Sequence, residues 1–139
     1  MNETILLGVT GNPILHSKSP LMFNRIFKEL DRNKTRAYTR LAAADAAEAM
    51  FLFKEIGLTG MNVTAPFKND IMEHVDEIED AGTAVGGINT VVNIDGKLNA
   101  DLHGFNTDIA GVIDSFKKRG IDVQGKTCIV LGAGGAGRA

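Results

Sequence analysis

Four groups of polar residues stand where an apolar run ends, and their side chains suit acid–base chemistry and the binding of small anions. The groups are 12–19, 62–68, 86–90 and 104–108. In an open α/β sheet, ligands usually bind where strands end and helices begin. The sequence therefore predicts a small-molecule site that these four groups share.

Lys68 and Asp108 form the candidate acid–base pair. Pro66 favours a helix start, and a lysine in the first turn of that helix would oppose the helix dipole at a cost of ~0.3–1 kcal/mol. The same field favours the neutral amine, which suits a group that transfers protons. The Asp108 carboxylate would accept a hydrogen bond from the lysine and orient it. The alternatives are a solvated surface lysine and an aspartate that only caps a helix.

Ser17 and Ser19 lie just before a helical pattern that begins at Pro20. Two hydroxyl groups and the free N–H groups of a helix N-terminus can hold a small anion such as a carboxylate. Taken alone, the pair also fits a simpler interpretation, in which Ser19 caps the helix and Ser17 belongs to the loop.

A glycine run follows the apolar segment 127–131, which is the local context of a dinucleotide-binding fingerprint. A glycine-rich turn is the alternative interpretation. The acidic or basic residue that would distinguish NAD from NADP is expected about 20 positions further on, beyond Ala139. The candidate cofactor-binding residues are Gly132, Gly134, Gly135 and Gly137.

The composition favours a cytoplasmic protein whose partner is a small molecule. Fifteen basic and seventeen acidic residues give a net charge of -2 without a basic block, which argues against nucleic acid as a partner. No apolar run approaches the ~20 residues that cross a membrane. The one cysteine, Cys128, is expected to pack as a small hydrophobe, and the three histidines lack metal-ligand spacing, so no metal site is predicted.

Alternating strand and helix patterns predict an α/β fold, with a mostly parallel open sheet, helices on both faces and one antiparallel hairpin strand. Asp95-Gly96 suits a two-residue type I′ turn between the hairpin strands. The expected strands are 4–10, 36–41, 59–64, 88–94, 97–103 and 127–131. The expected helices are 20–31, one that ends before Gly57, one that starts at Pro66, and 108–119.

The domain boundary is expected between the hairpin and the next helix. Residues 1–107 would form a substrate-binding domain, and 108–139 would be a connecting helix and the start of an incomplete Rossmann domain.

Together these motifs resemble the shikimate dehydrogenase family, in order and spacing, across almost the whole chain. The matching stretches are Gly11-Asn12-Pro13 with His16 to Pro20, Asn62-Val63-Thr64-x-Pro66-x-Lys68, Asn89-Thr90, Gly104-x-Asn106-Thr107-Asp108-x-x-Gly111, and Gly132 to Ala136. The resemblance implies an enzyme of aromatic amino-acid and chorismate biosynthesis that reduces 3-dehydroshikimate to shikimate with NADPH.

The resemblance also implies a role for each candidate residue. Ser17 and Ser19 would bind the substrate carboxylate. The ring hydroxyls would be bound by Thr64, Asn89 and Asp108, with Asn62 in support. Lys68 would be the acid–base residue, with Asp108 as its partner.

The family places its active site between two α/β domains, so we expect the 139-residue chain alone to be inactive in hydride transfer. An oxidoreductase acting on quinate and shikimate is one alternative. A non-catalytic regulatory domain that binds a hydroxy acid is another, although such a domain has no need of the Lys68–Asp108 pair. The sequence does not fix the oligomeric state, and self-association through uncovered apolar faces is a further possibility.

Overall fold

The computed structural model of the chain describes residues 4–30, 35–97, 101–132 and 134–138. It is an α/β structure with one six-stranded sheet in the order β2-β1-β3-β5-β6-β4. The strands are β1 (Thr4–Gly11), β2 (Thr35–Ala42), β3 (Gly60–Val63), β4 (Glu77–Ile78), β5 (Thr90–Asn93) and β6 (Leu102–Phe105). The helices are α1 (Ser19–Leu30), α2 (Ala46–Ile56), the 3-10 helix η1 (Asp70–His74), α3 (Asp80–Val85), α4 (Asp108–Lys118) and α5 (Gly135–Arg138).

The sheet is mostly parallel, as predicted, and β5 is its one antiparallel strand. β1 pairs in parallel with β2 and β3, and β4 pairs in parallel with β6. β5 runs antiparallel to both of its neighbours, β3 and β6. The carboxyl ends of β1, β3 and β6 and the amino end of β5 therefore meet at one edge of the sheet.

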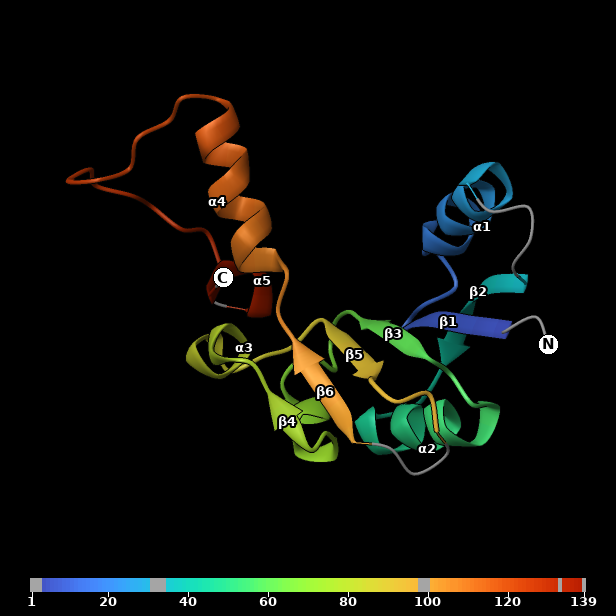
Figure 1. Cartoon of the computed structure of the whole chain (residues 1–139). Helices are drawn as coiled ribbons and strands as arrows, with labels where there is room; N and C mark the ends of the chain where they lie inside the picture. The colour runs from blue at the N-terminus through green and yellow to red at the C-terminus, as the bar shows by residue number, and fades with distance from the viewer. Residues whose placement is uncertain (1–3, 31–34, 98–100, 133, 139) are drawn as a thin grey trace.

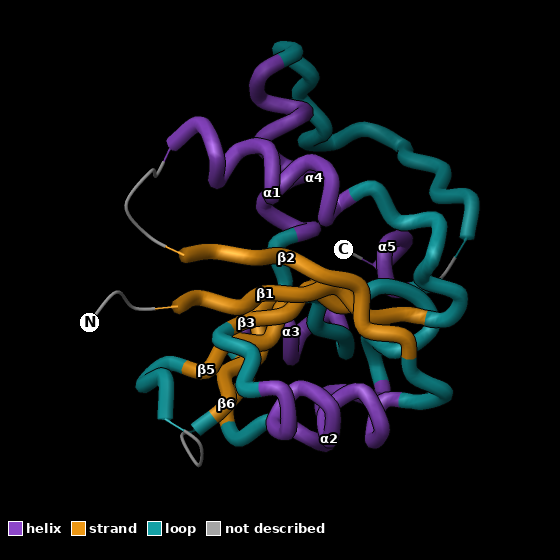
Figure 2. The backbone as a smooth tube through the Cα atoms, turned by 90° about the vertical axis from the view of Figure 1, so that its right-hand side faces the viewer, coloured by secondary structure: helices purple, strands orange, loops and turns teal. Residues whose placement is uncertain are grey.

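Helices cover both faces of the sheet (Figures 1 and 2), which confirms the predicted layering. α1 and α4 lie on one side and α2 lies on the other. The alternation of β1 explains this division, because Leu7 and Val9 pack toward α1 whereas Leu6 packs into the core beneath α2.

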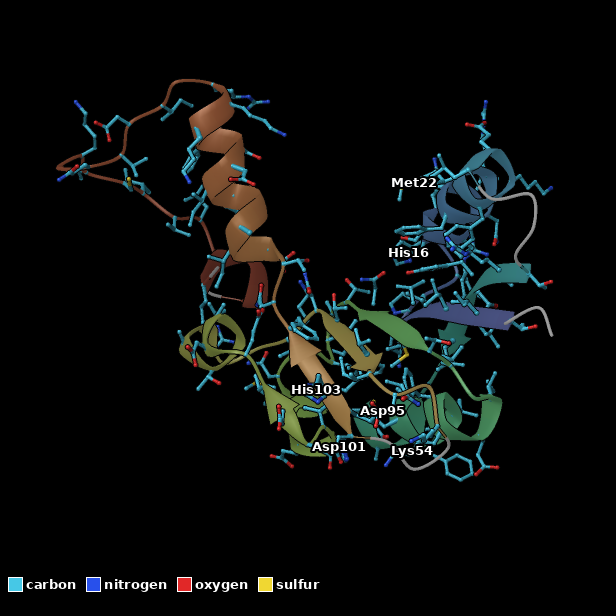
Figure 3. The ribbon with its side chains drawn as sticks, viewed as in Figure 1. His16, Met22, Lys54, Asp95, Asp101 and His103 are labelled. Carbon is cyan, nitrogen blue, oxygen red and sulfur yellow. The ribbon has the colours of Figure 1, made fainter. Side chains whose placement is uncertain are left out.

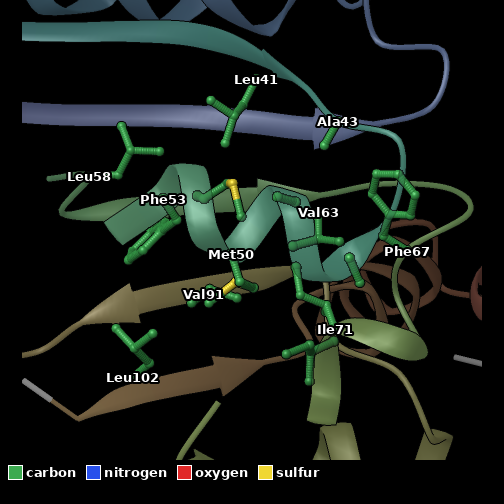
Figure 4. Close-up of a cluster of buried hydrophobic side chains, with 14 residues drawn as sticks. Leu41, Ala43, Met50, Phe53, Leu58, Val63, Phe67, Ile71, Val91 and Leu102 are labelled. Atoms are coloured by element: carbon green, nitrogen blue, oxygen red, sulfur yellow. The ribbon is translucent and has the colours of Figure 1, made fainter. Parts of the chain in front are cut away.

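The larger core lies between α2 and the sheet (Figure 4). Phe53 of α2 is 1% exposed and Val91 of β5 is fully buried. Asp45 caps α2 by accepting from the Glu48 N–H, and Gly57 ends it in the left-handed region at φ 71°. The core is completed by Leu41, Ala43, Ala46, Ala49, Met50, Leu58, Met61, Val63, Phe67, Ile71, Ile88 and Leu102.

The prediction of a helix that starts at Pro66 is wrong for its first residues. The segment 65–69 is a turn, and only η1 is helical after it. The Lys68 carbonyl accepts from the Ile88 N–H at 2.8 Å, while the Met72 N–H donates to Asn69. The Ala65 carbonyl would accept the first bond of a helix beginning at Pro66, but it accepts from the Asn12 N–H at 3.1 Å, and the first α-helical turn does not form.

The predicted hairpin turn also needs correction. β5 and β6 are hairpin partners, but Asn93 pairs with Leu102, and no residue except glycine has a positive φ among the described residues, so Asp95-Gly96 is no type I′ turn. Part of that connection, 98–100, lies outside the described residues. The short elements β4 and α3 were not predicted.

The segment 127–131 forms no strand, contrary to prediction, and Ile129 and Leu131 are 86% and 95% exposed. Strand backbone requires a neighbouring strand for its N–H and C=O groups, and no described segment pairs with this one. Cys128 is exposed for the same reason, so its predicted packing is also wrong. The proposed domain boundary at 107/108 stays a prediction.

Candidate active site

Lys68 and Asp108 meet at the edge of the sheet where β3 and β6 end. Lys68 Nζ donates to Asp108 Oδ2 at 2.5 Å, and their side chains are 17% and 32% exposed. The pair joins positions 40 residues apart in the sequence. A charge-assisted bond at this depth fixes the ammonium group while leaving the carboxylate in contact with solvent.

The position of Lys68 differs from the one used to predict it. It lies in the turn before η1 and not in the first turn of an α-helix, so the helix-dipole argument does not apply. The backbone bond from Ile88 N–H holds Lys68 instead. Asp108 is the first residue of α4, and its carboxylate binds side chains and not the helix backbone.

Asn89 connects the pair to the rest of the sheet edge. Its Nδ2 donates to Asp108 Oδ1 and to Thr107 Oγ1, both at 2.9 Å. Its Oδ1 accepts from the Thr107 N–H at 3.1 Å and from the Thr90 hydroxyl at 2.9 Å. Because a backbone N–H can only donate, the bond from Thr107 fixes the orientation of the Asn89 amide.

Asn62 lies beside Thr90 in the register of β3 and β5. Its Nδ2 donates to Thr90 Oγ1 at 3.3 Å, and its Oδ1 accepts from the Tyr38 hydroxyl at 2.7 Å. Thr64 follows β3, and its N–H donates to the Thr10 carbonyl at 2.9 Å. Thr64 therefore stands at the same edge, next to the loop that follows β1.

Ser17 and Ser19 form the second part of the edge. The Ser17 hydroxyl donates to Ser19 Oγ at 3.3 Å, and the Ser17 carbonyl accepts two bonds from the Arg40 guanidinium, at 2.9 and 2.5 Å. The Asn12 N–H donates to the Ala65 carbonyl at 3.1 Å, which joins the loops after β1 and β3. Within the described residues no hydrogen bond directly joins the serine pair to Lys68–Asp108.

The asparagine that precedes Asp108 fixes the start of α4. Asn106 Nδ2 donates to the Gly87 carbonyl at 2.7 Å, and the Asn106 N–H donates to Glu79 Oε1 at 2.5 Å. Its Oδ1 accepts from the Asp108 N–H at 3.0 Å. Asn106 is 5% exposed and therefore acts from inside the fold. These bonds fix the backbone at the start of α4 and therefore the position of the Asp108 carboxylate.

Two surface pockets differ in their relation to this site. One, of about 550 Å³, is lined by Asp108 and Thr107 together with one side of α4. The other, of about 340 Å³, lies near Lys54, Asp76 and Leu102, and none of the predicted site residues line it. Of these two pockets, only the first is lined by a residue of the hydrogen-bonded pair, Asp108.

The structure offers no metal site within the residues it describes, since no cluster of three His, Cys, Asp or Glu side chains occurs there. Figure 3 shows His16 beside α1 and His103 near β4, on separate parts of the molecule. His103 Nδ1 instead lies 3.4 Å from Glu77 Oε2. In the same described ranges, no helix is long and apolar enough to cross a membrane.

Sequence reasoning missed two residues of this region, Tyr38 and Arg40. Both lie on β2, in the predicted strand 36–41. Their partners are side chain or backbone groups 23 and 24 residues away, so nothing local marks them. The available signal was that Tyr38 is the one tyrosine of the chain and sits in an alternating strand.

The sequence model of the shikimate dehydrogenase substrate binding domain matches residues 9–91. This chain belongs to the shikimate dehydrogenase family. The shikimate dehydrogenase (NADP(+)) of Caldanaerobacter subterraneus subsp. tengcongensis is 39% identical over 138 residues, covering 99% of this chain and 48% of that protein. The shikimate dehydrogenase (NADP(+)) of Nitrosopumilus maritimus is 37% identical, covering 95% of this chain and 47% of that protein. The chain thus spans about half the length of these relatives.

Solved shikimate dehydrogenases have the same fold. The Peptoclostridium difficile shikimate dehydrogenase 1 superposes with a TM-score of 0.83 at 35% identity, over 99% of this chain and 48% of that one. The Thermus thermophilus shikimate 5-dehydrogenase in complex with NADP(H) and shikimate gives a TM-score of 0.79 at 32% identity, over 96% of this chain and 49% of that one. The family resemblance and the α/β fold predicted from the sequence are confirmed.

Proposed function

We propose that this chain binds shikimate and 3-dehydroshikimate, as the substrate-binding domain of an NADP-dependent shikimate dehydrogenase of the cytoplasm. The observation that carries the proposal is the Lys68–Asp108 hydrogen bond, which joins the ends of β3 and β6 in a chain of this family. A proton donor held by a carboxylate and bordered by amide and hydroxyl groups suits a polyhydroxylated ring with a reducible carbonyl.

The serine pair suits the carboxylate of such a ligand. The Ser17 and Ser19 hydroxyls are 3.3 Å apart, and Ser17 is held by Arg40, which also adds positive charge to this part of the edge. Hydroxyl donors beside a guanidinium group favour an anion over a neutral substituent. Thr64, Asn62 and Asn89 then supply donors and acceptors for the ring hydroxyls.

Lys68 is the proton donor in the reduction. Its ammonium group gives one proton to the carbonyl oxygen as the carbonyl carbon gains a hydride, so the C=O bond becomes a C–OH group and the lysine becomes a neutral amine. Asp108 holds the ammonium group in place before transfer and, with Asn89, binds the hydroxyl that results. Water then returns the proton to the lysine, since both side chains are partly exposed.

The glycine run fits the approach of a dinucleotide. Gly132 has φ 109°, a conformation that L side chains rarely adopt, and a Cβ atom on Gly137 would meet the Gly132 carbonyl oxygen. Gly132, Gly134, Gly135 and Gly137 would hold the pyrophosphate. When bound, the reduced nicotinamide supplies the hydride.

Isothermal titration of the purified chain with shikimate tests the binding proposal. We expect saturable binding that weakens about tenfold or more when Ser17 and Ser19 are both replaced by alanine, because two hydrogen bonds to a charged group are lost. The matched control is Thr83→Ala, an exposed hydroxyl on α3. Quinate in place of shikimate tests the main alternative ligand. Absence of saturable shikimate binding would refute the proposal.

A further inference from the structure

Tyr38 places a hydroxyl group from β2 next to the predicted ligand site, from inside the fold. The residue is 5% exposed, and its ring stacks on Phe23 of α1, with ring centroids 4.6 Å apart and planes at 12°. Its hydroxyl donates to Asn62 Oδ1 at 2.7 Å. This packing fixes the orientation of the ring and therefore the position of its hydroxyl group.

A continuous series of hydrogen bonds leads from Tyr38 to the acid–base pair. Asn62 Nδ2 donates to Thr90 Oγ1, and the Thr90 hydroxyl donates to Asn89 Oδ1. Asn89 Nδ2 donates to the Asp108 carboxylate, which also accepts from the lysine. From Tyr38 to Asp108 every donor points away from Tyr38, and Lys68 donates to the carboxylate from the other side.

Thr90 sets which way the Asn62 amide faces, because its hydroxyl donates to Asn89 and can then only accept from Asn62 Nδ2. Tyr38 holds the amide in this orientation by donating to Oδ1. An amide has one accepting oxygen and one nitrogen with two hydrogens, and its two orientations have nearly the same shape. With Oδ1 held by Tyr38, one Nδ2 hydrogen serves Thr90 and the second is available to a ligand oxygen. Burial raises the pKa of Tyr38 from 10 to about 12, so the hydroxyl stays protonated and able to donate at neutral pH.

We propose that Tyr38 is a positioning residue for substrate recognition, which anchors the Asn62 amide in the orientation that presents an N–H donor to a hydroxyl oxygen of the ligand. The inference rests on the proposed function, since it assigns a specificity device to the same site. It differs from the family roles described above, because Tyr38 acts only through Asn62 and touches no ligand.

Tyr38→Phe tests the inference with the ring and its stacking retained. We expect shikimate to bind about three- to tenfold more weakly by isothermal titration, the loss typical of one hydrogen bond. Asn62→Ala should weaken binding as well, and adding Tyr38→Phe to Asn62→Ala should change the Kd no further. Thr35→Val, which removes an exposed hydroxyl from the same strand, is the matched control and should bind as the unaltered chain does.

The outcomes separate this inference from the proposed function. Saturable shikimate binding by the unaltered chain, together with an unchanged Kd for Tyr38→Phe, would overturn the positioning role alone. The role also fails if Tyr38→Phe weakens binding equally in the unaltered and Asn62→Ala backgrounds, because the tyrosine would then act on general packing. If the unaltered chain does not bind shikimate, both the proposed function and this inference fall.

Discussion

Replacing Asp108 with asparagine should damage the site more than its small change in shape suggests. Both carboxylate oxygens face donors, since Oδ2 accepts from Lys68 Nζ at 2.5 Å and Oδ1 accepts from Asn89 Nδ2 at 2.9 Å. Asparagine has one accepting oxygen, so its NH2 group must face either the lysine or Asn89. Each orientation places two donors against each other, and the ammonium group loses its counter-charge.

The cost follows from the burial of the pair. A hydrogen bond to a charged group contributes about 1.5–3 kcal/mol. Lys68 is 17% exposed, so its ammonium group regains little water when the carboxylate is removed. We therefore expect Asp108→Asn to lower the free energy of unfolding by about 2–3 kcal/mol, and to lower the midpoint of thermal unfolding by roughly 10 °C or more.

Urea unfolding followed by circular dichroism measures this difference. The matched control is Asp114→Asn, which makes the same change at an exposed position of α4 and should shift stability by less than about 0.5 kcal/mol. Equal stability of the two variants would refute the reasoning that both oxygens of Asp108 carry bonded donors.

Three other predictions concern the core and the sheet edge. Burial raises the pKa of Tyr38 to about 12, so the stability it gives is complete below pH 10 and is lost as the pH rises through 12. Over that pH range, the free energy of unfolding of the unaltered chain should fall by up to about 2–3 kcal/mol more than that of Tyr38→Phe. Absorbance at 295 nm follows the ionisation directly, because the chain has one tyrosine and no tryptophan. Gly11→Ala should weaken shikimate binding and lower thermal stability, because the added Cβ would lie 2.8 Å from the Ala65 carbonyl oxygen; unchanged binding would contradict this. Phe53→Ala should lower the free energy of unfolding, measured in urea, by about 3–5 kcal/mol. Phe51→Ala changes a side chain that is 61% exposed and should lower it by less than about 0.5 kcal/mol. Similar losses in the two variants would place the core elsewhere.

The parallel half of the fold could be predicted because its patterns are local. The run from Thr4 to Gly11 ends in a polar loop, Pro20 follows a serine at a helix start, and Gly57 closes α2. Each signal acts within a few residues of the boundary it sets. Those elements match the structure to within one or two residues.

The failures come from interactions between distant segments. The turn at 65–69 depends on Asn12, whose N–H donates to the carbonyl of Ala65. β4 is two residues long and exists because it pairs with β6. A pattern within 66–75 contains neither partner, so it favours a longer helix.

The site shows the same division. Lys68 and Asp108 could be proposed as partners because each stands in a polar group after an apolar run, and the topology brings those groups to one edge. Tyr38 could not, because its role depends on the order of β2, β1 and β3 across the sheet and on Phe23. The alternation of a strand shows which side chains are buried, but it does not identify the distant partner of a buried hydroxyl.

α4 is held to the sheet at its first residue, so a small rotation there would move the far end of the helix. Its first turn is tied to the sheet through Asn106, Thr107 and Asp108, whereas no residue of the helix is fully buried. Eleven residues at 1.5 Å each make the helix about 16 Å long. A rotation of about 10° at Asp108 would therefore displace the last turn by about 3 Å. Such a rotation would therefore couple the position of the end of α4 to the carboxylate that holds the proton donor.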